Sequence, residues 1–117
     1  MPQPVVILCT CESRHQGEQI AHALVAERLA ACVNIVSGIT SVYRWQGAVE
    51  TASEHLLLIK TTLEEANAVE ERIGQLHSYD TPELLRLSVE GGSQRYLAWL
   101  ISAVGESEAA AGPEHKA

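Results

Sequence analysis

The order of its apolar segments constrains this chain more than any other feature. Between residues 5 and 104, short apolar runs alternate with amphipathic segments in the order strand, helix, strand, strand, helix, strand, and one more helical segment follows. Short runs rich in Val and Ile are typical of buried strands, whereas apolar residues at intervals of three and four are typical of helices that cover a sheet. The pattern therefore indicates an α+β domain.

The boundaries of these elements follow from local signals. Ser13 and Thr62 each stand three residues before a Gln or a Glu, which is the spacing of a capping box at a helix start. Gly38 predicts a bulge, and Gln46-Gly47 predicts a turn between the second and third strands. The expected strands are 5–10, 32–36 continuing through 42–45, 55–60 and 83–90, and the expected helices are 14–31, 62–76 and 93–104. This order is that of the ferredoxin-like, or split βαβ, sandwich.

The ferredoxin-like topology brings distant residues together. Its first strand lies between the third and the fourth, and the fourth runs antiparallel to the first. The loop 77–82, which enters the fourth strand, is therefore expected beside 9–11 at the exit of the first strand, with the hairpin turn 45–47 at the same end. We expect a site there.

Size and charge narrow the classes of function. The chain has 117 residues, enough for one domain, which we place at 1–104, with a flexible tail at 105–117. The formal net charge of −7 disfavours binding to nucleic acid or to anionic lipid and favours cations as partners. Because no run is long and apolar enough to span a membrane and no secretion signal is evident, we expect a cytoplasmic protein.

The second and third strands form a hairpin that is long for a domain of this size. Residues 32–61 are expected to project beyond the helices and to leave edge groups unpaired. Pairing with further copies of the chain would remove that problem, so we expect a closed homo-oligomer. The alternative is a hairpin that folds back on its own domain.

Cys9 and His77 are the candidate metal ligands. A thiolate and an imidazole are preferred by Cu(I) and Zn(II), and a third ligand could come from Cys11, His15 or another subunit. The alternative is structural, with Cys9 packed in the core and His77 at a helix end. A catalytic Cys9 with His77 as its base lacks an evident orienting Asp and an oxyanion-hole motif, so we expect no enzyme.

Five segments, in this order along the chain, resemble the CutA divalent-cation-tolerance family. They are Leu29–Ile35 (LAACVNI), Ser41–Gly47 (SVYRWQG), Leu58–Thr62 (LIKTT), His77–Glu83 (HSYDTPE) and Tyr96–Leu100 (YLAWL). The resemblance extends from about residue 5 to residue 104.

The resemblance implies a ferredoxin-like homotrimer with a role in tolerance of copper and other divalent metals. The family's copper ligands, a Cys on the first strand and a His after the second helix, match Cys9 and His77. Some members carry a second His where this chain has Leu76, so the resemblance implies weak binding of copper here. Positions matching the family's pocket between subunits are Tyr43, Trp45, Lys60, Tyr79, Glu83 and Trp99.

Two other functions stay open on the sequence. A signalling trimer similar to the PII proteins would bind a small anionic ligand at the subunit interface through Lys60 and Arg44. A third possibility is a scaffold whose trimer presents surfaces to another protein.

Overall fold

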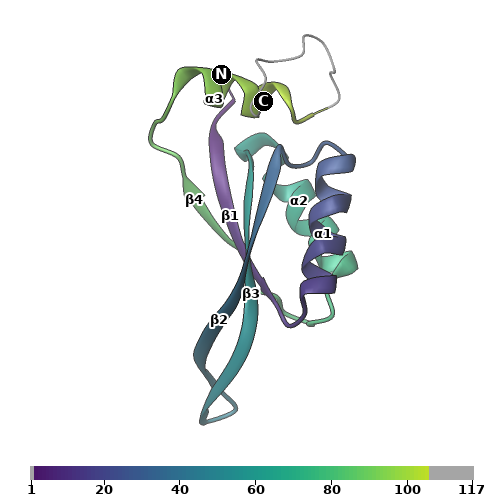
Figure 1. Cartoon of the computed structure of the whole chain (residues 1–117), viewed down its shortest axis with the longest axis vertical. Coiled ribbons are helices and arrows are strands. Elements are labelled where there is room, and N and C mark those ends of the chain that lie inside the picture. Colours follow the sequence, from purple (N-terminus) through teal and green to yellow (C-terminus); the bar gives the residue numbers. More distant parts are fainter. Residues whose placement is uncertain (1, 106–117) are drawn as a thin grey trace.

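Four strands form one antiparallel sheet in the order β2-β3-β1-β4 (Figure 1). The computed structural model describes residues 2–105. Its strands are β1 (Pro4–Cys11), β2 (Cys32–Trp45), β3 (Ala48–Thr62) and β4 (Leu85–Ser88), and its helices are α1 (Arg14–Ala26), α2 (Leu63–Leu76) and α3 (Gln94–Ser102). The predicted ferredoxin-like α+β fold is confirmed.

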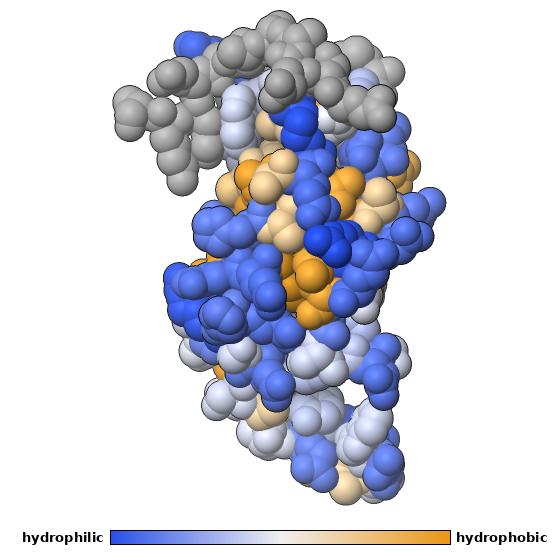
Figure 2. All heavy atoms as spheres, turned by 90° about the vertical axis from the view of Figure 1, so that its right-hand side faces the viewer, coloured by the Kyte–Doolittle hydropathy of each residue, from blue (hydrophilic) through white to orange (hydrophobic). Residues whose placement is uncertain are grey.

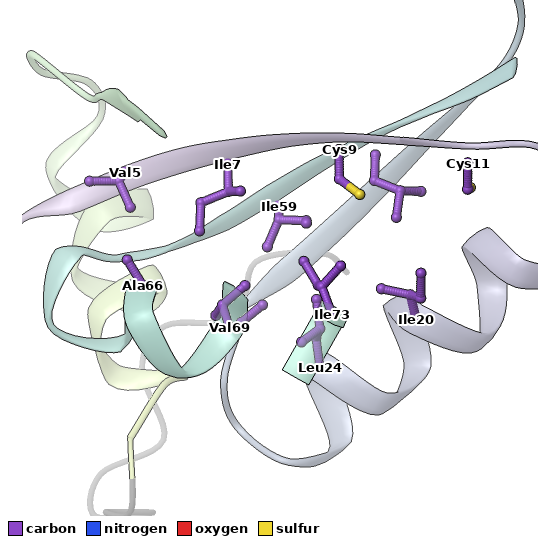
Figure 3. Close-up of a cluster of buried hydrophobic side chains, with 12 residues drawn as sticks. Val5, Ile7, Cys9, Cys11, Ile20, Leu24, Ile59, Ala66, Val69 and Ile73 are labelled. Atoms are coloured by element: carbon purple, nitrogen blue, oxygen red, sulfur yellow. The ribbon is translucent and has the colours of Figure 1, made fainter. Parts of the chain in front are cut away.

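The core lies between the sheet and helices α1 and α2. Side chains alternate along β1, so that Val5, Ile7 and Cys9 point to the helices and are at most 2% exposed. Ile20 of α1 and Ile73 of α2 meet them, as Figure 3 shows. The other face of the sheet carries neither of these two helices, and its apolar side chains are only partly covered.

Helix α1 is shorter than predicted and ends at Ala26, although apolar spacing continues to Leu29. Arg28 adopts a left-handed φ of 60°, and the amide of Leu29 turns back to the carbonyl of Leu24. The Arg28 guanidinium donates to the carbonyls of Ser102, the last residue of α3, and of Gly105. Contacts with a distant segment therefore favour the helix end, and local spacing could not reveal them.

Of the three residues that precede the helices, only Ser13 and Ser93 make a side-chain cap hydrogen bond. The hydroxyls of Ser13 and Ser93 accept from the amides of Gln16 and Tyr96, as expected for N-caps. Thr62 precedes α2 but makes no side-chain cap bond. The amide of the next residue, Leu63, instead donates to a backbone carbonyl near the N-terminus, at 2.7 Å.

The β2–β3 hairpin extends well beyond the helices and gives the molecule a length of 50 Å against 27 and 26 Å across (Figure 1). Gln46 and Gly47 form its turn with φ of 49° and 83°, the conformation that a two-residue hairpin turn requires. The pairing register shifts between Val36 and Ile39, and Gly38 lies there with φ of 76°. The predicted turn and bulge are confirmed.

Strand β4 spans four residues instead of the eight predicted for 83–90. It pairs only with the first half of β1, from Val5 to Leu8, and runs out near Pro4 where β1 begins. The second half of β1 is thus not paired with β4 and instead lies beside the loop that precedes β4. Of the predicted tail 105–117, all but Gly105 lies outside the described residues, and no helix within 2–105 is long and apolar enough to cross a membrane.

Candidate functional site

His77 and the end of β1 meet as predicted, although 67 residues separate His77 from Thr10. His77 follows the last residue of α2 and is 8% exposed. Its Nε2 lies 2.7 Å from the carbonyl oxygen of Thr10, and its Nδ1 lies 3.0 Å from the backbone nitrogen of Tyr79. The Tyr79 ring also packs against the imidazole, with centroids 4.7 Å apart.

These two bonds define the proton arrangement of the imidazole. A carbonyl only accepts, so Nε2 carries the proton that is donated to Thr10, and a backbone N–H only donates, so Nδ1 is the acceptor. His77 is therefore a neutral imidazole whose two nitrogens are both engaged. A metal can bind either nitrogen only after one of these hydrogen bonds is broken.

Cys9 lies in the core with no exposed surface. Its Sγ is 3.7 Å from the carbonyl oxygen of Thr10. Burial, and then the nearby Cys11, Glu83 and Glu54, raise the pKa of the Cys9 thiol to about 12. The thiol is thus protonated at neutral pH, which makes it a poor nucleophile and a metal ligand only after it loses the proton.

The other candidate ligands do not complete a site around Cys9 and His77. Cys11 points to the same buried side as Cys9, and its Sγ donates weakly to the carbonyls of Ser13 and His55. His15 is exposed on the first turn of α1. Within residues 2–105 there is no group of three or more His, Cys, Asp or Glu side chains arranged to hold a metal ion.

A cavity of about 680 Å³ lies on the helix-free side of the sheet, between the hairpin and the loop 77–84. Tyr43, Trp45, Tyr79 and Glu83, four of the residues predicted for a pocket, line this cavity. The other two do not. Lys60 and Trp99 gather around Tyr96 of α3, with the Lys60 Nζ 5.7 Å from its ring centroid and the Trp99 ring 5.5 Å from it.

Lys60 lies on β3 like the cavity residue Glu54, but far from it along the strand. It lies six residues from Glu54 of the lining, which corresponds to about 20 Å along a strand. Within this single chain, the six predicted pocket residues thus form two groups at opposite ends of the sheet.

Glu54 also lines the cavity and is not among the residues predicted for a pocket. It is 8% exposed, and its Oε2 accepts a hydrogen bond of 2.9 Å from the Tyr79 hydroxyl. Burial, and then this bond to Glu54, raise the pKa of the Tyr79 phenol well above its usual range. The sequence signal that could have identified it is a Glu directly before the apolar run 55–60, where a buried ionisable side chain needs a hydrogen-bond partner.

The pKa of Cys9 predicts a loss of stability in alkali. The unfolded chain releases this proton near pH 9.0, whereas the folded chain keeps it until about pH 12. The Cys9 contribution to the free energy of unfolding is therefore complete below pH 9 and declines as the pH rises to 12. By pH 10 the decline amounts to roughly 1 kcal/mol.

Denaturant unfolding at pH 8 and pH 10 measures this decline, with Cys9→Ala as the variant that lacks the titrating thiol. Wild type should lose more stability between the two pH values than Cys9→Ala, while Cys32→Ala should behave as wild type. Equal losses in wild type and Cys9→Ala would contradict the assignment.

Sequence comparisons match almost the whole described chain to one family. A family described as CutA1 divalent ion tolerance protein matches residues 5–103. A divalent-cation tolerance protein CutA from Thermus thermophilus is 50% identical over 95 residues, covering 81% of this chain and 92% of that protein. The chain spans a little over half the length of two chloroplastic CutA relatives, from Arabidopsis thaliana (53%) and Oryza sativa (58%).

Solved structures show the same fold. The crystal structure of CutA1 from Oryza sativa superposes with a TM-score of 0.87 at 42% identity, covering 92% of this chain and 97% of that one. The cation tolerance protein from Thermus thermophilus gives a TM-score of 0.86 at 48% identity, covering 87% and 99%. The sequence match and the shared fold together show that this chain belongs to the CutA1 divalent ion tolerance family.

Proposed function

We propose that the protein is a homotrimer that binds copper, and other divalent cations, weakly and serves tolerance of these metals, with Cys9 and His77 as ligands. Relatives up to 50% identical are named for divalent-cation tolerance. One observation carries the ligand assignment: the His77 Nε2 lies 2.7 Å from the carbonyl of Thr10, the residue that follows Cys9.

The donor chemistry supports a soft, thiophilic ion. A thiolate sulfur with an imidazole nitrogen suits Cu(I), and the net charge of −7 raises the local concentration of cations. We propose binding and not catalysis, since a covalent mechanism needs an accessible thiolate and Cys9 is buried and protonated.

The same contacts explain why the affinity should be low. Ionising a thiol of pKa about 12 at pH 7 costs about 7 kcal/mol. A metal on His77 must also displace either the Thr10 or the Tyr79 hydrogen bond. Both costs reduce the net free energy of binding, so an exchangeable ion is expected, not a permanent centre.

The surface supports the trimer. Val6 pairs with Leu87 and Leu8 with Leu85, so these leucines of β4 lie on the helix-free face of the sheet, 55% (Leu85) and 49% (Leu87) exposed. The side that carries α1 and α2 is mostly hydrophilic around a small apolar area (Figure 2). The apolar helix-free face and the projecting hairpin offer two different surfaces, and their head-to-tail pairing between copies can close a ring of three.

Leu87→Asp should dissociate the trimer, because it places a charge in the proposed interface. Sedimentation velocity should show a trimer for wild type and a slower species for Leu87→Asp. Val25→Asp is the matched control, since Val25 is 42% exposed on α1, and it should remain trimeric. A wild-type monomer, or equal behaviour of the two variants, would contradict the proposed interface.

The copper assignment is tested by competition for Cu(I) with a chromophoric chelator under reducing conditions. We expect one site per chain in wild type and loss of that site in both Cys9→Ser and His77→Ala. Cys32→Ser is the control, because Cys32 lies outside the site and is only half-buried. Weak binding without defined stoichiometry in every protein would exclude Cys9 and His77 as ligands.

We propose that the protein resides in the cytoplasm, a reducing compartment. All three cysteines within the described part of the chain are free thiols. Cell fractionation of the source organism should recover the protein with soluble cytoplasmic markers. Recovery with an organelle or with the periplasm would contradict this placement.

A further inference from the structure

The bulge of β2 places a serine beside a histidine. The register shift between Val36 and Ile39 leaves Ser37 and Gly38 together opposite His55 of β3. The Oγ of Ser37 lies 3.0 Å from the Nδ1 of His55. A hydroxyl within hydrogen-bond distance of an imidazole nitrogen is the pairing of nucleophile and base that covalent chemistry uses. The bulge therefore brings together the two groups that acylation of a serine requires.

Arg14, the first residue of α1, completes the cluster. Its Nη1 donates to the Ser37 Oγ at 2.8 Å, and its Nε donates to the Glu18 carboxylate at 2.9 Å. Because a guanidinium only donates, Ser37 accepts from Arg14 and keeps its own hydrogen for the Nδ1 of His55. Arg14 is thus placed to stabilise negative charge that develops on the Ser37 Oγ, and its remaining N–H groups can donate to the carbonyl oxygen of a reactant.

The cluster lies on the side of the sheet that carries α1 and α2. His55 precedes the core residue Leu57 by two positions, and side chains two positions apart on a strand share a face. The helix-free face proposed for contacts between copies is therefore on the other side of the sheet. The bond from Arg14 to Ser37 also places the cluster at the base of the hairpin, beside the start of α1, and not on the part that projects beyond the helices (Figure 1).

A small reactant has access to the hydroxyl. Ser37 and Gly38 are both exposed. Gly38 has a φ of 76°, and a Cβ built on it would meet no other atom within 4 Å. The backbone next to the nucleophile is therefore open to an approaching molecule.

Other chemistry fits this cluster less well. An anion would have to compete with Glu18, which already forms an ion pair with Arg14. A metal ion would find one imidazole, and residues 2–105 hold no group of three or more His, Cys, Asp or Glu side chains arranged for a metal. A neutral electrophile avoids both difficulties.

We propose that Ser37 is a nucleophile that accepts an acyl group from an activated ester or thioester, with His55 as its base and Arg14 stabilising the developing charge. The Ser37 Oγ forms a bond to the acyl carbon, and the bond from that carbon to the leaving oxygen or sulfur breaks. The hydroxyl hydrogen passes to the Nδ1 of His55 and then to the leaving group. The product is an O-acyl serine, and this covalent modification of the chain shares no residue with the proposed metal ligands Cys9 and His77.

The experiment treats the full chain with p-nitrophenyl acetate at neutral pH. Release of p-nitrophenolate gives the rate, and peptide mass spectrometry locates the acetyl group, which distinguishes Ser37 from lysines and thiols. Wild type should release one p-nitrophenolate per chain in a burst and carry the acetyl group on Ser37. His55→Asn should slow this acetylation roughly a hundredfold, because a positioned base contributes at least that much. Ser53→Ala is the matched control, since Ser53 is an exposed serine of the same hairpin, and it should react as wild type.

Two further variants keep the test decisive. Ser37→Ala should abolish the burst, and Arg14→Gln, a change on the exposed first turn of α1 where folding depends little on the side chain, should slow acetylation roughly tenfold. The proposal is overturned if wild type carries no acetyl group on Ser37, if His55→Asn reacts as fast as wild type, or if Ser53 is acetylated as fast as Ser37. A cluster that only braces α1 against the hairpin would give the first of these results. Failure of the Cu(I) titration leaves all of them unchanged, so the two proposals fail separately.

Discussion

The position of β1 in the middle of the sheet determines where every chemically interesting group lies. It pairs along its whole length with β3 but only through its first half with β4, because β4 is four residues long. The second half of β1 is therefore covered by the loop after α2 instead of a strand. The hydrogen bond from His77 to the Thr10 carbonyl takes the place of a ladder bond there.

Because this loop stands where a strand would be, the two faces of β1 at Cys9 and Thr10 lie in different environments. Cys9 points into the core beneath the helices, and Thr10 points to the opposite face, where it lines the acidic cavity. A dry, apolar environment thus holds the thiol in its protonated form, while a wetter environment one residue away holds carboxylates and aromatic rings. The proposed metal ligands Cys9 and His77 thus lie beside the acidic cavity without lining it.

Much of this arrangement could be predicted from residue order. The apolar runs and the Gln46-Gly47 turn specified the ferredoxin-like topology, and the topology alone placed residues 9–11 beside 77–82. The features that could not be predicted depend on long-range contacts. Helix α1 ends where it does because Arg28 donates to carbonyls at the end of α3, and β4 ends near the residue where β1 begins. Local periodicity carries no information about such partners.

The candidate site shows the same division. The resemblance to the CutA family singled out Tyr43, Trp45, Tyr79 and Glu83, and all four line the cavity. Glu54 was missed because its role depends on burial, which arises when the Tyr79 loop closes over the end of the sheet. Lys60 was predicted for a pocket between subunits, and within a single chain the fold places it about 20 Å along β3 from Glu54.

Tyr79 is the residue through which the two environments communicate. Its backbone N–H donates to the Nδ1 of His77, and its hydroxyl donates to the Oε2 of Glu54. A ligand that takes Nδ1 must displace this N–H, and the movement would reach the phenol that satisfies the buried carboxylate. Metal binding at His77 would therefore be coupled to the hydrogen bond on Glu54, because Tyr79 makes both contacts.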